Sequence, residues 1–121
     1  MRTLVEAYFA AINTEDFDGL AAVFAPDVEI HTTGSDPVLG RDAALAHFRA
    51  VLANYPSHTD AVTRWIEAPD AVVCEIAFTG RLADGREIRF DALDVFDAGD
   101  DAITRVSTWY DTRSVARQVR G

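Results

Sequence analysis

The spacing of apolar residues predicts three helices in the first half of the chain. The first covers 3–13 and has an apolar face of Leu4, Val5, Tyr8, Phe9, Ala11 and Ile12. Asp16, a residue type favoured at helix N-caps, precedes the second, whose stripe of Phe17, Leu20, Ala21 and Phe24 ends at Pro26-Asp27. The third begins near Arg41 or Asp42 and ends at Pro56, with a stripe of Leu45, Phe48, Val51, Leu52 and Tyr55.

Alternation of apolar and polar residues predicts strands elsewhere. One strand covers 28–33 and is followed by the turn-rich loop GSDPVLG. Four more cover about 59–67, 71–82, 87–97 and 102–110, and their short connections predict an antiparallel meander. Asp111 is placed to cap a short amphipathic helix over 112–119. This order of elements predicts an α+β fold in which helices pack on one face of a curved sheet.

Composition narrows the class of protein. The chain has 121 residues, 49% hydrophobic and 26% charged, which predicts a single domain spanning 1–121. A net charge of −9 and a pI near 4.5 argue against binding to nucleic acid or to an anionic membrane, because both need clustered Lys and Arg. The N-terminal apolar run is interrupted by Glu6, so we expect neither a signal peptide nor a membrane span, and we expect a cytoplasmic protein.

The sequence carries no signature of a metal or cofactor site. Its single cysteine, Cys74, excludes an internal disulfide and alternates with apolar residues as a buried small side chain would. His31, His47 and His58 lack the spacing that seats a metal ion. Nucleophile elbow, phosphate-binding loop and dinucleotide-binding motifs are also missing. We therefore expect no metal and no cofactor.

The strand at 87–97 carries an acidic residue, Asp94, on an apolar row. Because strand side chains alternate between faces, one face has Ile88, Phe90, Ala92, Asp94 and Phe96, and the other has Arg89, Asp91, Leu93 and Val95. Two interpretations are open. Either Asp94 faces the interior, or Leu93 and Val95 form the core row and Asp94 faces outward.

An inward Asp94 would have a distinctive chemistry. Desolvation would raise its pKa, because the charged form loses hydration without gaining a cation. The neutral acid could then donate a hydrogen bond to a carbonyl oxygen that becomes an enolate in the transition state. Tyr8, on the buried face of the first helix, would be a second donor or, alternatively, an ordinary aromatic core residue.

Several strings resemble the nuclear transport factor 2-like superfamily, and within it the ketosteroid isomerase-like and SnoaL-like polyketide cyclase groups. YFAAINTEDFDGLAAVFAPDVEI is similar to the isomerase opening, and LDVF followed by ITRVSTWYDTRSVARQV is similar to the SnoaL-like ending. The resemblance covers nearly the whole chain. It implies a cone-shaped curved, mixed sheet wrapped around three N-terminal helices, with a short C-terminal helix, and a homodimer formed through the open sheet face.

The resemblance also implies roles for individual residues. Tyr8 and Asp94 fall where ketosteroid isomerases have their oxyanion-hole tyrosine and protonated aspartic acid. Thr32 falls where those enzymes have the general-base aspartate, and threonine cannot take a proton from carbon at neutral pH. Asp111 resembles the acidic residue at the end of the last strand in polyketide cyclases, although helix capping is a competing role. The final-strand aspartate of related epoxide hydrolases falls near Thr108, which argues against that activity.

We therefore expect a protein that binds a small apolar carbonyl compound and acts as an isomerase or cyclase through an enolate. Tyr8, Asp94 and Asp111 are the candidate catalytic residues. The expected ligand contacts are Ile12, Phe24, Thr32, Phe48, Trp65, Phe90, Phe96, Thr108 and Tyr110. Two alternatives remain: a non-catalytic ligand-binding domain, which the threonine at position 32 favours, and a dimerisation domain with a filled interior.

Overall fold

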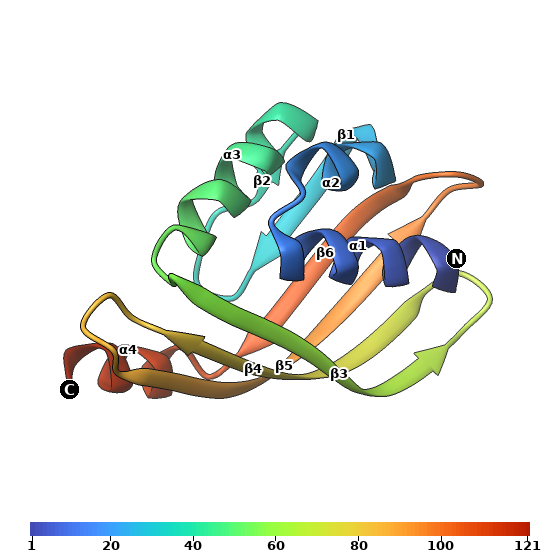
Figure 1. Cartoon of the computed structure of the whole chain (residues 1–121). Coiled ribbons are helices and arrows are strands. Elements are labelled where there is room, and N and C mark those ends of the chain that lie inside the picture. The colour runs from blue at the N-terminus through green and yellow to red at the C-terminus, as the bar shows by residue number, and fades with distance from the viewer.

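A computed structural model describes residues 1–121 as one mixed sheet curled around three helices (Figure 1). In chain order the elements are α1 (Arg2–Thr14), α2 (Phe17–Val23), β1 (Phe24–Thr32), β2 (Val38–Leu39), α3 (Arg41–Leu52), β3 (Ser57–Glu67), β4 (Val72–Arg81), β5 (Glu87–Ala98), β6 (Ile103–Tyr110) and α4 (Thr112–Arg120). The strand order is β2-β1-β6-β5-β4-β3, in which only the β1–β6 pair is parallel. None of the helices is both long and apolar enough to cross a membrane. The predicted α+β architecture is confirmed.

Local signals explain where the helices begin and end. α1 ends at Glu15, which adopts a left-handed conformation with φ 52°, so that the chain turns directly into α2. The Asp16 carboxylate accepts a 2.9 Å hydrogen bond from the Gly19 amide and caps α2, as its sequence position predicts. The tight α1–α2 connection places both helices on the same side of the sheet (Figure 1).

Two predictions made for the region after α2 were wrong. β1 begins at Phe24, four residues earlier than expected, so Phe24 belongs to a strand and not to a helical stripe. Pro26 lies within β1 where the pairing with β6 shifts register between Phe24 and Glu29, because proline has no amide proton to give to the ladder. The loop after β1 also contains the two-residue strand β2, whose Val38 and Leu39 pair with Ile30 and Glu29.

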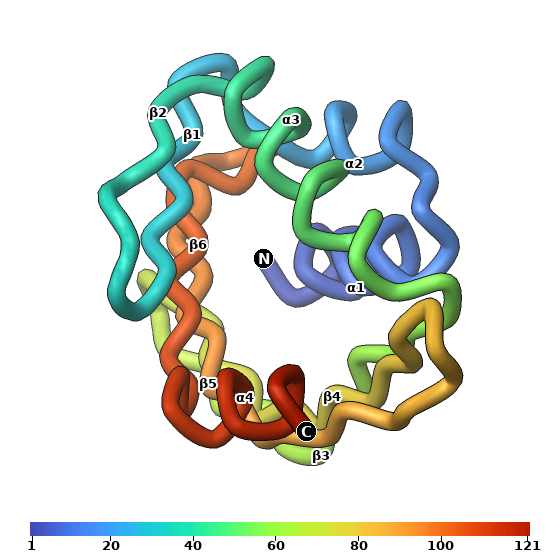
Figure 2. The backbone as a smooth tube through the Cα atoms, turned by 90° about the vertical axis from the view of Figure 1, so that its left-hand side faces the viewer, coloured from blue at the N-terminus to red at the C-terminus, as the bar shows by residue number.

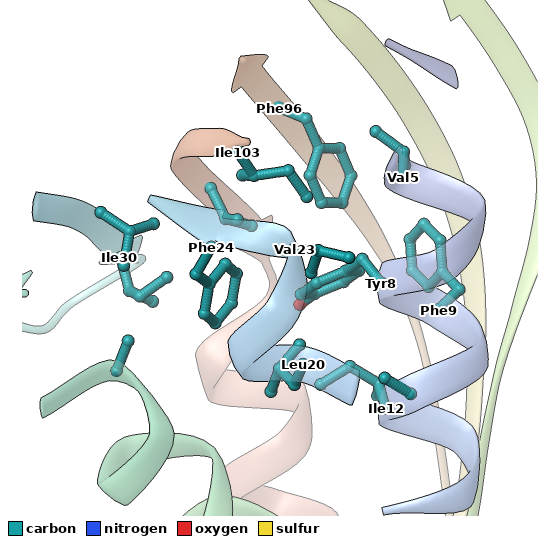
Figure 3. Packing of buried hydrophobic residues seen from close by; sticks show 14 of the residues in the cluster. Val5, Tyr8, Phe9, Ile12, Leu20, Val23, Phe24, Ile30, Phe96 and Ile103 are labelled. Carbon is teal, nitrogen blue, oxygen red and sulfur yellow. The ribbon is translucent and has the colours of Figure 1, made fainter. Parts of the chain in front are cut away.

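The core lies between α1, α2 and the curled sheet. Figure 3 shows Val5, Tyr8 and Phe9 of α1 facing Phe96 of β5, with Leu20 and Val23 of α2 beside them. In Figure 2 the strands and the three N-terminal helices surround a common interior, and α4 lies at one end of it. Buried side chains therefore fill the interior next to α1 and α2. The part of the interior next to α3 and α4 holds a cavity.

Candidate functional site

A cavity of about 180 Å³ lies between α1, α3 and the concave face of the sheet. Seventeen residues line it and twelve of them are hydrophobic, which is typical of a small-molecule site. Eight residues predicted from the sequence as site residues are among them: Tyr8, Ile12, Thr32, Phe48, Phe90, Asp94, Thr108 and Tyr110. α4 contributes Val115, so the C-terminal helix borders the cavity.

Strand register places Asp94 on the inner face of the sheet. Asp94 of β5 pairs with Cys74 of β4 on one side and with Thr108 of β6 on the other. Its side chain is 5% exposed, whereas the neighbouring Leu93 is 37% exposed and Asp91 is exposed on the outer face. Of the two interpretations that the sequence left open, the inward one is confirmed.

The surroundings of Asp94 favour its neutral form. The pKa of Asp94 is raised to about 7, mainly by burial, against the lowering effect of a hydrogen bond from Thr108 and with a smaller rise from the negative charge of Asp60. Thr108 Oγ1 donates that bond to Asp94 Oδ1 at 2.7 Å. The second carboxyl oxygen has no hydrogen-bond partner in the protein, so near neutral pH it can carry a proton and donate it to a ligand.

Tyr8 brings a second hydrogen-bonding group to the same cavity. Its ring packs against Phe9 and Phe96 with centroid separations of 5.1 and 5.0 Å, which fixes the side chain within the core. Its hydroxyl has no hydrogen-bond partner in the protein, although the residue lines the cavity. Burial, together with the negative charges of Asp94 and Asp60, raises the pKa of Tyr8, so the phenol stays protonated and can donate.

Three predicted ligand contacts lie outside the cavity. Phe24 and Phe96 are 2% and 0% exposed within the core cluster, where they support Tyr8. Trp65 lies under the Arg2 guanidinium, whose carbon is 4.3 Å from the ring centroid, at the far end of α1. All three predictions rested on aromatic character, which does not distinguish a ligand contact from core packing.

The structure also places Asp111, a predicted catalytic residue, away from the cavity. Asp111 is exposed, and its Oδ1 accepts a 3.0 Å hydrogen bond from the Ser114 amide as the N-cap of α4. Asp111 lies one residue beyond the end of β6, where side chains no longer alternate between the two faces of the sheet. Its carboxylate therefore does not point inward with Thr108 and Tyr110. The competing role considered from the sequence, helix capping, is the one observed.

Asp60 of β3 is a cavity residue that the sequence analysis missed. It lies partly buried on the inner row of β3 with His58 and Val62. Burial raises the pKa of Asp60 to about 6, and the nearby His58 opposes that rise. The pattern that identified Asp94 could also have identified Asp60, because both are acidic residues on the same face of a strand as an apolar residue.

The remaining polar residues of the cavity show no metal site. No group of three or more His, Cys, Asp or Glu side chains is close enough to hold a metal ion. His47 of α3 lines the cavity, and burial lowers the pKa of its imidazole, so it is neutral at physiological pH. No lysine or arginine lines the cavity.

Comparison with known proteins identifies relatives of this fold. The model of the SnoaL-like domain family matches residues 5–106. A nuclear transport factor 2-like protein of unknown function from Burkholderia pseudomallei is similar in structure, with a TM-score of 0.90, 19% identity and coverage of 99% of this chain and 97% of that chain. An LEH-like epoxide hydrolase from M. tuberculosis has a TM-score of 0.83 at 22% identity, with coverage of 98% and 89%.

A proposed SnoaL-like polyketide cyclase from a Jannaschia species is a further structural neighbour, with a TM-score of 0.88, 16% identity and coverage of 97% of this chain and 89% of that chain. No curated protein matches the chain in sequence. The structural likenesses, all at low identity, establish the fold, and the different activities named among these neighbours leave the chemistry to be argued from the cavity itself.

Proposed function

This chain belongs to the SnoaL-like domain family, and we propose that its cavity binds a small, largely apolar molecule through a carbonyl or phenol oxygen. Asp94 and Tyr8 are the two donors to that oxygen. The observation that carries the proposal is Asp94 itself, an acid that is 5% exposed, has no cationic partner and borders an apolar cavity. An ionised ligand oxygen would be stabilised there by two protonated groups in a site of low polarity.

The proposed chemistry is proton transfer through an enolate, as in an isomerase or a cyclase. When a carbonyl compound loses a proton from the adjacent carbon, negative charge develops on its oxygen. Hydrogen bonds from Asp94 and Tyr8 would strengthen as this charge grows, and interactions that strengthen in the transition state accelerate the reaction. No cofactor is needed for this step.

The size of the cavity limits the ligand. Its volume of about 180 Å³ is below the roughly 300–1,000 Å³ of sites that take drug-sized molecules. One or two fused rings would fit between Phe48 of α3 and Phe90 of β5, whereas a four-ring compound would need the cavity to open. Aromatic residues from both elements favour a flat, conjugated ligand.

Binding of 2-naphthol, whose phenol oxygen resembles an enolate oxygen, tests the proposal. Calorimetry or the fluorescence of naphthol itself is the appropriate readout, because Trp65 and Trp109 do not line the cavity. We expect micromolar binding at pH 6 that Asp94→Ala weakens at least tenfold. Asp91→Ala, which removes an exposed acid from the outer face of the same strand, is the matched control. Absence of binding, or equal loss in both variants, would contradict the proposal.

The second candidate function is non-catalytic binding of the same class of ligand. Thr32 favours it, because this residue lines the cavity at the position where the resemblance to isomerases implies a general base. A binder and an enzyme differ in whether the bound ketone exchanges its α-protons with solvent faster than it does in buffer. Such exchange would support the enzyme, and naphthol binding without exchange would support the binder.

A further inference from the structure

The cavity holds a second acid, Asp60 of β3, two strands away from Asp94 of β5. We propose that Asp60 is the proton acceptor of the site and removes a proton from the carbon adjacent to the ligand's carbonyl group. The inference rests on the proposed function, since it assumes that the ligand oxygen lies against Asp94 and Tyr8. It assigns a catalytic residue that replaces the base missing at Thr32.

The separation of the two acids suits this division of roles. Asp60 pairs with Phe78 across β3 and β4, whereas Asp94 pairs with Cys74 across β4 and β5. The two positions are thus two strands apart across the sheet and offset by four residues along β4, which is about 13 Å along the strand direction at the usual rise per residue. Because the sheet is concave, both side chains point into one cavity from different walls. A flat ligand between them would present its oxygen to one acid and its carbon framework to the other.

The backbone of Asp60 is fixed to the helix that carries Tyr8. β3 is an edge strand, and its outer backbone groups at Asp60 have no strand partner. The Asn13 side chain of α1 takes the place of that partner. Its Nδ2 donates to the Asp60 carbonyl oxygen at 3.0 Å, and its Oδ1 accepts from the Asp60 amide at 2.8 Å. Asn13 therefore fixes the position of the Asp60 backbone relative to Tyr8 and is a positioning residue.

A second contact beside it links the same two elements. His58 Nε2 lies 3.0 Å from Glu15 Oε2, at the end of α1, and the imidazole is almost fully buried. A positive charge on His58 would favour the ionised form of Asp60 against the effect of burial. Together the Asn13 and Glu15 contacts hold the inner row of β3 against α1.

The carboxylate of Asp60 is free to take a proton. No hydrogen bond or ion pair in the structure involves its side-chain oxygens, and no lysine or arginine reaches the cavity. A purely structural acid at such a position would be expected to have a partner, because an unpaired buried carboxylate is costly. Its pKa, raised to about 6, leaves it mostly ionised at neutral pH and still basic enough to accept a proton from carbon.

The step balances without any further reactant. The Asp60 carboxylate forms an O–H bond with the α-proton of the ketone. The electron pair of the broken C–H bond forms a carbon–carbon double bond, and the carbonyl π electrons move to oxygen. Asp94 and Tyr8 donate hydrogen bonds to that oxygen. If the proton on Asp60 is first replaced by one from solvent, its return to the same carbon gives exchange with solvent. If Asp60 instead delivers its proton to another carbon of a conjugated ligand, the result is isomerisation.

Exchange of the α-protons of 2-tetralone in D₂O, followed by proton NMR, tests the inference in wild-type protein, Asp60→Asn and Asp91→Asn. We expect Asp60→Asn to slow the protein-catalysed exchange at least about 100-fold, the lower range for loss of a general base. Asp91→Asn should match wild type. Both variants should still bind 2-naphthol at pH 5, where Asp94, with a pKa of about 7, is protonated and can donate to the ligand.

Each outcome bears on one of the two proposals. Naphthol binding without accelerated exchange, or equal exchange by Asp60→Asn and wild type, would overturn the role of Asp60 and leave the binding proposal standing. Absence of naphthol binding would overturn the binding proposal and this inference with it. If Asp60→Asn is poorly folded, Asp60→Ala with added formate is the second variant. Restored exchange would support the role, and unchanged exchange with a folded variant would contradict it.

Discussion

Thr108 Oγ1 donates a 2.7 Å hydrogen bond to Asp94 Oδ1 between directly paired positions of β5 and β6. This contact fixes the orientation of the carboxyl group and occupies only one of its oxygens. It also lowers the pKa of Asp94 against the larger effect of burial. Thr108 therefore controls both the direction in which Asp94 donates and the pH above which it stops donating.

The exchange reaction should have a narrow bell-shaped pH profile. Asp60, with a pKa of about 6, must be ionised, and Asp94, with a pKa of about 7, must be protonated. The rate should rise through pH 6 and fall above pH 7. The other titratable groups near or lining the cavity are Tyr8 and Glu15 from the α1 end, His47 and Tyr55 from and after α3, His58 on β3, Cys74 on β4 and Tyr110 on β6.

Thr108→Val should move the alkaline limb of that profile to higher pH. The substitution removes the hydrogen bond that lowers the pKa of Asp94, so the acid stays neutral over a wider range. Thr63→Val is the control, since the Thr63 hydroxyl bonds to the Glu75 carbonyl oxygen on the outside of the sheet. An alkaline limb that stays in place, or shifts equally in both variants, would show that Asp94 does not set it.

Stability should fall as pH rises from about 4 to above 7. The folded-state pKa of Asp94, about 7, exceeds its unfolded value, so the folded protein binds the extra proton across this range. The stabilisation is complete below the unfolded pKa and is lost as pH passes the folded one. Asp94→Asn, which keeps the shape without the charge, should raise Tm at pH 8 by roughly 5 °C.

Thermal unfolding at pH 5 and pH 8 measures this effect, with Asp91→Asn as the control. Both substitutions remove one negative charge from the same strand, but Asp91 is exposed. A general reduction of the net charge of −9 would therefore stabilise both variants alike. If the two variants show the same pH dependence, the cause is overall charge and not burial of Asp94.

Asp111 should behave as a helix cap and not as a catalytic acid. Asp111→Ala should cost about 1 kcal/mol in the local stability of α4, because the Ser114 amide loses its acceptor. Asp111→Asn should retain most of that stability, since asparagine is also a good N-cap. Hydrogen exchange of the α4 amides is the measurement. A catalytic Asp111 would instead make both substitutions equally harmful to ketone exchange.

The outer sheet face should mediate association of two copies. Leu93 and Trp109 are paired across β5 and β6 and are 37% and 56% exposed, and Ile66 of β3 is 40% exposed. Several exposed apolar side chains on one face of a sheet are typical of an interaction surface. We expect sedimentation to show a dimer that Leu93→Glu converts to monomer, with Glu87→Gln as a control at an exposed position. A wild-type monomer at all concentrations would contradict this.

The sequence predicted the architecture well because periodicity reports directly on burial. β4 alternates between more and less buried residues along its whole length, and β3, β5 and β6 began and ended within two residues of their predicted bounds. Asp16 and Asp111 were recognised as caps for the same local reason. The start of β1 at Phe24 was missed, because a proline two residues later suggests a break and the register shift that accommodates it depends on β6.

The lining of the cavity was predicted only in part. Tyr8 and Asp94 were placed in it correctly, because each lies on an apolar face of its own element. Asp60 was missed because its importance depends on α1 and α3 closing over β3, and on the Asn13 side chain 47 residues away. Trp65 and Phe96 were assigned to the ligand wall, because the sequence does not show at which depth of the cone the core ends and the cavity begins.

The proposed function depends above all on Asp94 being a neutral acid at the wall of the cavity. Carbon-13 NMR of the side-chain carboxyl groups between pH 3 and pH 9 tests it most directly, with the Asp94 signal assigned from its absence in Asp94→Asn. We expect this carbon to titrate with a pKa of about 7. A titration near pH 4, the ordinary value for aspartate, would contradict it.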